Sequence, residues 1–292
     1  MASRRSFLRT FATVGAGLFV PLKWSKQSFA AIPGGSLNPG SVPKYVTPFV
    51  IPPAMPRSNK GRNRGFDYYE IAVQQFRQHI LPPSMGLPPT TVWSYGAAEY
   101  PGTVAQGGTF NYPAFTVEAS YERPVRVSWI NGLVGKNGKY LPHILPVDPT
   151  LHWANPPGGV GGRDMRPMFM STPGPYKGPV PIVTHVHGAH THEESDGYAQ
   201  AWYLPAARNI PRGYATVGSW YKTFAAKFKA KIGQGWNWGS AVFQYPNDQR
   251  AATLWYHDHT LGMTRMNVYA GPAGFYLLRG GPGDLPPGTL PG

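Results

Sequence analysis

Glycine and proline together make up more than a fifth of this chain, with 36 and 33 residues among 292. Both are poorly tolerated inside helices and are typical of turns. Between them lie short runs rich in β-branched and aromatic residues, several alternating between apolar and polar side chains as half-buried strands do. These runs are YYEIAVQQF, TTVWSYG, FTVEASY, PVRVSWING, PIVTHVHG, SAVFQYP, ATLWYHDH and AGFYLLRG. We therefore expect an all-β protein that folds as an antiparallel sandwich with long loop insertions.

The eight runs fall within residues 66–280, which we take as one domain, long enough to bury its own core. Two insertions rich in turn residues, 151–179 and 203–238, interrupt it, and the second is expected to include a short helix around Ser219 to Ile232. Residues 281–292 are predicted to be a linker or a truncated end.

The first thirty residues predict an export signal. The paired arginines Arg4 and Arg5 precede a weakly apolar stretch rich in Gly and Ala, and the small residues of SFAA suit cleavage after Ala30. The apolar stretch is shorter than the roughly 20 residues that span a bilayer. We therefore expect a twin-arginine signal peptide over residues 1–30, no membrane span, and a periplasmic, cell-envelope or extracellular protein. The alternative is a basic amphipathic helix that stays attached. Residues 31–65 are too dense in Pro, Gly and Ser for a regular element and predict an extended N-terminal arm.

The formal charge of +14 raises the question of a nucleic-acid partner. Five of the basic residues lie in the first thirty, and the rest are scattered, with one dense run, Lys222 to Lys231. We interpret that run as a solvated face and predict no nucleic-acid partner. The chain contains no cysteine, which excludes disulfides, thiolate catalysis and metal sites that require cysteine sulfur. Imidazole and oxygen ligands remain.

Six of the nine histidines fall in two short segments, THVHGAHTH and WYHDH. Within a strand, residues two apart point to the same face about 6 to 7 Å apart, so each HxH pair can hold two neighbouring metals or converge on one. Two such strands side by side would bring together four imidazoles, a costly arrangement without a metal. The four candidate metal ligands are His185, His187, His257 and His259. The other histidines, namely His190 and His192 in a loop and the isolated His79, His143 and His152, are interpreted as structural or peripheral residues.

Two segments, THVHGAHTHEESDGYAQAWY and YPNDQRAATLWYHDHTLGMTRMNVYAGPAGFYLL, resemble the first cupredoxin domain of bacterial multicopper oxidases, especially the spore-coat laccase and bilirubin oxidase branch. Weaker similarity extends the resemblance over roughly residues 66 to 280. It implies a cupredoxin-like Greek-key β-sandwich, the plastocyanin-like type of domain, with copper as the cofactor.

The resemblance also implies roles for single residues. His185 would be a ligand of the type 2 copper, and His187, His257 and His259 would serve the paired type 3 coppers. Asp196, in SDGY, matches a family acid that helps to deliver protons during dioxygen reduction, although a turn-capping aspartate is the alternative. The alternation of the strand turns Asp258 away from its flanking histidines, so it is expected to support the site without binding metal. Trp255 and Tyr256 are expected to serve in packing.

Part of the family's apparatus is missing from this sequence. In the family, four further histidines and a type 1 copper with a cysteine ligand lie near the C-terminus, whereas this chain has no cysteine and ends where a second domain would begin. We therefore expect half of a trinuclear copper site, inactive without a C-terminal half. The expected partners are dioxygen, a reducing small molecule and, where the gene continues downstream, that missing half.

Two alternatives to part of an oxidase stay open. The first is a copper-binding cupredoxin module without catalysis, which the missing cysteine favours. The second is a cupin-like mononuclear metalloenzyme, because HxH followed by Glu193, Glu194 and Gly197 loosely matches that pattern. A closed barrel would support this second alternative and a sandwich would exclude it.

Overall fold

The structure is a computed structural model that describes residues 35–48, 50–61, 65–286 and 288–289. It divides into two compact units, Met1–Thr47 and Pro48–Gly292. In the first unit the described residues include one short 3-10 helix, η1 (Pro39–Ser41), whose first turn is capped by the side chain of Asn38. The predicted signal peptide lies outside the described residues. Both sheets and the candidate site belong to the second unit.

The first sheet has the strand order β2-β1-β4-β6. Its strands are β1 (Asp67–Gln78), β2 (Thr90–Ala97), β4 (Val125–Asn131) and β6 (Ser240–Tyr245). Strand β1 pairs antiparallel with β2 and parallel with β4, and β4 pairs antiparallel with β6.

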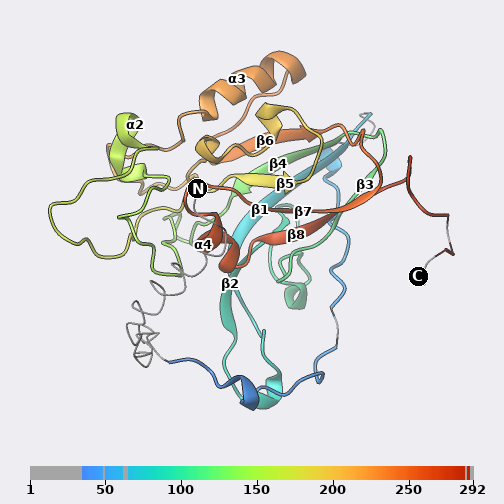
Figure 1. The fold of residues 1–292 in the computed structure, drawn as a ribbon, viewed down its shortest axis with the longest axis horizontal. Helices are drawn as coiled ribbons and strands as arrows, with labels where there is room; N and C mark the ends of the chain where they lie inside the picture. The colour runs from blue at the N-terminus through green and yellow to red at the C-terminus, as the bar shows by residue number, and fades with distance from the viewer. Residues whose placement is uncertain (1–34, 49, 62–64, 287, 290–292) are drawn as a thin grey trace, which may run out of the picture. The chain divides into compact units, whose positions relative to one another are not determined.

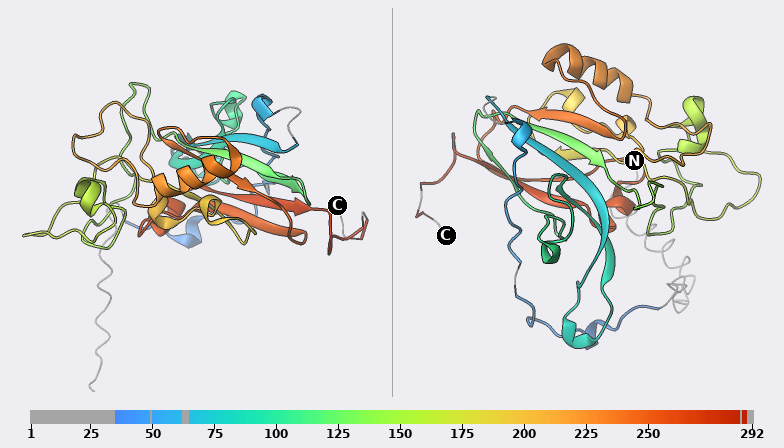
Figure 2. Two further views of the ribbon diagram at one scale, coloured as in Figure 1. Left: turned by 90° about the horizontal axis from the view of Figure 1, so that it is seen from above. Right: turned by 180° about the vertical axis from the view of Figure 1, so that it is seen from behind.

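The second sheet has the order β3-β8-β7-β5. Its strands are β3 (Val117–Ser120), β5 (Thr184–His187), β7 (Ala252–Asp258) and β8 (Ala273–Arg279). Strands β3 and β8 run parallel, whereas β7 pairs antiparallel with both β8 and β5. The two sheets pack face to face (Figures 1 and 2), which confirms the predicted all-β sandwich.

The prediction of purely antiparallel sheets was wrong, because each sheet contains one parallel pair. The chain crosses from the first sheet to the second between β2 and β3. The two parallel pairs, β1 with β4 and β3 with β8, each join strands that are separated by a long stretch of chain. Such a crossover lets a strand return beside an earlier one in the same direction. Two separate four-stranded sheets also contradict the cupin-like alternative, which needs a closed barrel.

Large aromatic side chains fill the space between the sheets. Tyr95 and Trp129 from the first sheet and Tyr256 from the second are fully buried, with ring centroids 5.0 to 5.5 Å apart. Their polar atoms are satisfied: the indole nitrogen of Trp129 donates to the hydroxyl of Tyr245 at 3.1 Å, and the hydroxyl of Tyr256 donates to the carbonyl of Phe115 at 2.5 Å. The aromatic runs of the sequence therefore form a core without leaving these donors unpaired.

The expected short helix is α3 (Tyr221–Ile232), which lies outside the strands (Figure 1). It buries Tyr221, Phe224 and Phe228 on one face and turns its lysines to solvent, as predicted for the basic run. Lys231 reaches Glu194 at 3.4 Å and Lys227 pairs with Glu193, and these contacts tie α3 to the loop after β5.

The other helical elements are short. They are η2 (Asn59–Gly61), η3 (Pro83–Met85), η4 (Val104–Gln106), η5 (Pro156–Gly158), α2 (Gly159–Gly162), η6 (Glu193–Ser195), η7 (Ala199–Ala201) and α4 (Thr264–Tyr269). The segment of residues 151–179, which carries η5 and α2, projects as a long loop (Figure 2). Across the ranges that the structure describes, no helix has the length and apolar character needed to cross a bilayer.

Candidate metal centre

The two HxH pairs lie on neighbouring strands at one end of the second sheet. His185 and His187 belong to β5, and the antiparallel register places His185 opposite His257 of β7. Just past the end of β7, the backbone N–H of His259 donates to the carbonyl of Val183 at 2.8 Å, so the fourth histidine stays beside β5. The structure thus brings the rings of all four predicted ligands near one another, but only His185, His187 and His257 present nitrogens that lie within 4.8 Å of one another.

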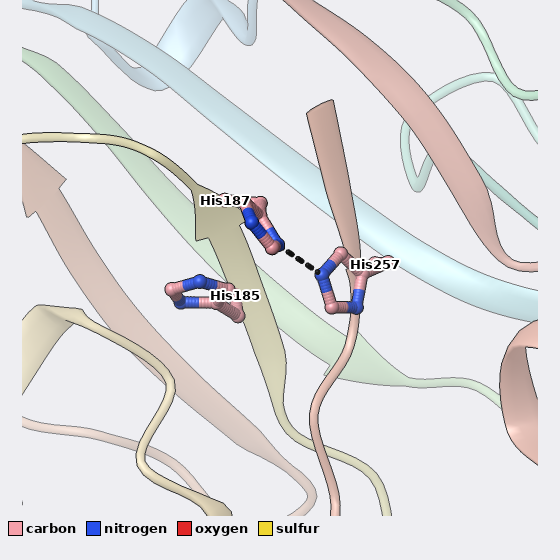
Figure 3. A group of neighbouring side chains, drawn as sticks. All are labelled: His185, His187 and His257. Carbon is pink, nitrogen blue, oxygen red and sulfur yellow. Dashed lines mark hydrogen bonds between the residues drawn. The ribbon is translucent and has the colours of Figure 1, made fainter. Parts of the chain in front are cut away.

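The imidazole rings surround a common space on the sheet face opposite the core. The centroid of the His185 ring lies 5.5 Å from that of His187, 5.6 Å from that of His257 and 4.8 Å from that of His259. Nitrogen atoms of His185, His187 and His257 all lie within 4.8 Å of one another. Figure 3 shows these three side chains on the two neighbouring strands.

The separation of two nitrogens fits a shared metal ion. Nδ1 of His187 lies 3.2 Å from Nε2 of His257. Metal bonds to imidazole are about 2.0 to 2.1 Å long, so two nitrogens at this distance can bind one ion with an N–metal–N angle of about 100°. Imidazole donors suit copper, zinc, iron and nickel. The donor set therefore fits a transition metal.

Backbone carbonyls select which nitrogen faces the metal. Nδ1 of His185 donates to the carbonyl of Asp196 at 2.5 Å, and Nδ1 of His257 donates to the carbonyl of Asp258 at 2.7 Å. Because a carbonyl only accepts, each Nδ1 carries the proton, and each Nε2 is the unprotonated nitrogen. In the metal-free protein Nδ1–H of His187 then donates to Nε2 of His257.

The imidazole of His259 differs from those of His185 and His257 in its hydrogen bonding. Its Nδ1 is buried and has no hydrogen-bond partner within the part of the chain that the structure describes. A buried imidazole nitrogen without a partner is costly, which sets His259 apart from His185 and His257.

Burial keeps two of the four rings neutral. Burial, together with the neighbouring imidazoles, lowers the pKa of His257 to about 4 against the opposing effect of its hydrogen bond to the Asp258 carbonyl. Burial and the charge of His185 also lower the pKa of His259. Burial opposes a charge on His185 too, but its hydrogen bonds to Asp196 and the carboxylate charge outweigh burial and raise its pKa. At neutral pH the lone pairs of His257 and His259 are therefore available to a metal.

Asp196 contacts His185 through both its backbone and its side chain. The carboxylate oxygen lies 3.3 Å from Nδ1 of His185, and the side chain is 45% exposed, so it connects that nitrogen with solvent. The turn that carries it packs tightly on β5: Gly197 has φ +76°, and a Cβ there would lie 2.1 Å from the carbonyl oxygen of Thr184. The absence of a side chain at residue 197 therefore lets the Asp196 carbonyl reach His185.

Asp258 turns away from the metal face, as the strand alternation predicted. It is 1% exposed and accepts hydrogen bonds from Val183, Thr260 and Asn267. Burial raises its pKa to about 6, although these hydrogen bonds oppose the shift.

The other histidines lie apart from the cluster. His190 is exposed with Nδ1 3.7 Å from a carboxylate oxygen of Asp248, and His152 bonds to the carbonyl of Asp164 at 2.8 Å. His143 is buried and bonds to Asn267 at 3.1 Å, which agrees with its interpretation as a structural residue.

Two contacts of the site were not predicted. Trp255 is 39% exposed, and its ring lies 4.1 Å from that of His257 and 5.4 Å from that of His187, so it borders the cluster as well as packing. Asn267 contacts Asp258, and its only sequence signal was its place in the NVYAG segment.

Comparison with known proteins places these motifs in a family. No model of a known protein family matches the sequence. A laccase from Bacillus stratosphericus is 32% identical over 235 residues, which cover 80% of this chain and 33% of that protein. A laccase from Haloferax volcanii is 33% identical over 279 residues, which cover 94% of this chain and 36% of that protein. A crystal structure of a multicopper oxidase from Pediococcus acidilactici is similar at 15% identity and a TM-score of 0.45, over 82% of this chain and 31% of that one.

The chain thus spans about a third of the length of the laccases that it matches. At 32% and 33% identity over 80% and 94% of this chain, the similarity to these laccases shows that the chain belongs to the multicopper oxidase family.

Proposed function

We propose that this chain supplies half of the ligands of a trinuclear copper site in a laccase-type oxidase. The observation that carries the proposal is the convergence of nitrogens from His185, His187 and His257 within 4.8 Å on the outer face of a sheet. His185 would serve the type 2 copper, and His187, His257 and His259 the type 3 pair. When bound, copper supplies the redox chemistry by which dioxygen is reduced to water.

The protein's own residues would hold the ligands and move protons. The carbonyls of Asp196 and Asp258 keep the protons of His185 and His257 on Nδ1, so that both Nε2 atoms face the site. The half-exposed Asp196 carboxylate, 3.3 Å from Nδ1 of His185, would pass protons from solvent toward the cluster. We propose a phenol-like or other small reducing donor as the electron source and a C-terminal half as the partner that completes the site. Export by the twin-arginine route, to the periplasm, cell envelope or exterior, is part of the proposal.

A second function is a copper-binding module without catalysis. The observation that favours it is the lack of cysteine, which leaves the chain without a thiolate for a blue-copper electron-entry site.

Copper analysis separates the two. The full chain is purified alone and together with the polypeptide encoded directly downstream, and copper per chain, blue absorbance and oxygen uptake with a phenol are measured. An oxidase part predicts copper beyond one ion, blue colour and oxygen uptake only in the combined sample. A copper-binding module predicts copper without uptake in both samples, and no copper in either sample would refute both functions.

A further inference from the structure

A buried chain of hydrogen bonds runs from the metal centre into the core on the side away from the metal. It begins at Asp258, which lies between His257 and His259 in the sequence but points in the opposite direction. It continues through Asn267 of α4 to His143. None of these three side chains faces the common space of the imidazoles, so their arrangement needs its own explanation.

All four hydrogen bonds that the Asp258 carboxylate accepts come from uncharged donors. Oδ1 accepts from the backbone N–H of Val183 at 3.2 Å and from the hydroxyl of Thr260 at 2.8 Å. Oδ2 accepts from the backbone N–H of Thr260 at 3.0 Å and from Nδ2 of Asn267 at 2.9 Å. These four donors hold both oxygens of the carboxylate, so the carboxylate group has little freedom to rotate.

Asn267 is itself fixed on every side. Its Nδ2 donates to Asp258 and also to the carbonyl of Pro181 at 3.1 Å, which uses both of its N–H groups. Its Oδ1 therefore accepts, and Nε2–H of His143 donates to it at 3.1 Å. Nδ1 of His143 in turn accepts the backbone N–H of Leu145 at 2.9 Å. This chain leaves one possible orientation for the amide of Asn267 and one tautomer for His143.

The network acts on the backbone that carries the metal ligands. Val183 donates its N–H to the Asp258 side chain and accepts the N–H of His259 at its carbonyl, so Asp258 closes a ring that ties the end of β7 to the start of β5. The carbonyl of Asp258, whose direction this ring sets, accepts Nδ1–H of His257 at 2.7 Å. Without Asn267, this peptide would be held only by the N–H of His259 and by three of the four donors to Asp258, so the carbonyl would be less firmly fixed.

We propose that Asn267 is a positioning residue for the metal centre. Through Asp258 it fixes the carbonyl that holds His257 in its Nδ1–H tautomer and keeps Nε2 directed at the metal. This inference rests on the proposed function for its relevance to copper, but the tautomer can be measured in the metal-free protein. Side chains that orient a ligand in this way typically change metal affinity about 10- to 100-fold when removed.

The test is a long-range 1H–15N correlation spectrum of the metal-free full chain labelled at histidine nitrogens, with the His257 signals assigned by their loss in His257→Gln. The wild-type protein is expected to show His257 as the Nδ1–H tautomer alone. Asn267→Ala is expected to show a mixture of the two tautomers and at least about a tenfold weaker affinity for Cu²⁺.

Asn131→Ala is the matched control. Asn131 is also buried and also uses both N–H groups of Nδ2, which it donates to the carbonyls of Val180 and Tyr203, but it has no hydrogen bond to Asp258 or the imidazoles in the described structure. It should lower the melting temperature without changing the His257 tautomer. If Asn267→Ala does not fold, Thr260→Val serves instead, because it removes one donor to Asp258 and keeps the side-chain shape.

The outcomes are distinct. A His257 tautomer that stays Nδ1–H in folded Asn267→Ala, or in Thr260→Val where the alanine variant is unfolded, would overturn the proposal and leave the network a purely structural one. A changed tautomer supports it. A changed tautomer, together with no copper bound by the wild-type chain either alone or with the polypeptide encoded downstream, would support the positioning role and refute the proposed function.

Discussion

Nδ1 of His187 and Nε2 of His257 face each other at 3.2 Å across two antiparallel strands, although the residues are 70 positions apart in the chain. In the metal-free protein one hydrogen bond joins them, and a metal ion would replace the shared proton. The pair is therefore the most direct place to test whether the centre binds metal.

Alanine at either position should weaken Cu²⁺ binding sharply. We expect His187→Ala and His257→Ala each to lower the affinity by at least about a hundredfold, because each removes a direct ligand rather than an orienting group. The double variant should lose less Cu²⁺ binding free energy than the two single variants lose together, since both residues serve one site. Calorimetric titration measures all three, with the exposed His79→Ala as the control. Equal affinity in the wild type and His257→Ala would contradict the assignment.

Gly197→Ala tests the close packing of the turn that carries Asp196. Its φ of +76° disfavours a side chain, and its Cβ would meet the Thr184 carbonyl at 2.1 Å, so the turn must move and release His185. We expect a loss of more than about 1 to 3 kcal/mol in the free energy of unfolding, together with weaker metal binding.

Gly213→Ala is the matched control for that change. Gly213 has φ +89° but nothing within 4 Å of its Cβ position, so alanine there has only the backbone cost. Urea unfolding compares the two variants. An equal loss in both would show that the contact with Thr184 is unimportant.

Acid should destabilise the protein in part through His143. Burial lowers its pKa to about 4, from the ordinary value of 6.5, so between these values the unfolded chain binds a proton that the folded protein does not. This difference contributes about 3 kcal/mol to the free energy of unfolding. The contribution is complete above pH 6.5 and is lost as the pH falls to about 4. His143→Gln should lose this part of the slope when the free energy of unfolding is measured from pH 7 to 4. If His143→Gln leaves this pH dependence unchanged, the proton taken up on unfolding does not bind His143.

Tyr256→Phe separates the core from the metal centre. The variant removes a buried hydrogen bond to the carbonyl of Phe115 and leaves that carbonyl without its donor, at a cost of about 1 to 3 kcal/mol. Metal affinity should not change, because the Tyr256 side chain points to the opposite face from His257. Tyr269→Phe, at an exposed ring, is the control and should change neither quantity.

The positions of the strands could be predicted from the sequence, but the direction in which the strands pair could not. Each aromatic or β-branched run between turn residues became a strand or ended next to one, because local propensity and burial act within a few residues. The direction of pairing between β1 and β4, or between β3 and β8, depends on where the chain crosses between sheets, and no short pattern encodes that.

The same division holds for the site. The spacing in HVH and HDH predicted that the imidazoles of each pair share a face, and the structure brings the pairs together. The roles of the Asp196 and Asp258 carbonyls could not be predicted, because a backbone oxygen leaves no trace in residue type. Asn267 was missed for a related reason: its partners Asp258, Pro181 and His143 are brought to it only by the fold.

The outward position of the cluster bears on the order in which the protein is assembled. His187 is exposed, and its strand neighbour Trp255 and the residue paired with that tryptophan, Phe275, lie on the same uncovered side of the sheet. An ion can therefore reach the nitrogens after the polypeptide has finished folding, without any opening of the aromatic interior. We therefore expect this chain to take up metal reversibly after folding, at a rate governed by metal supply rather than by refolding.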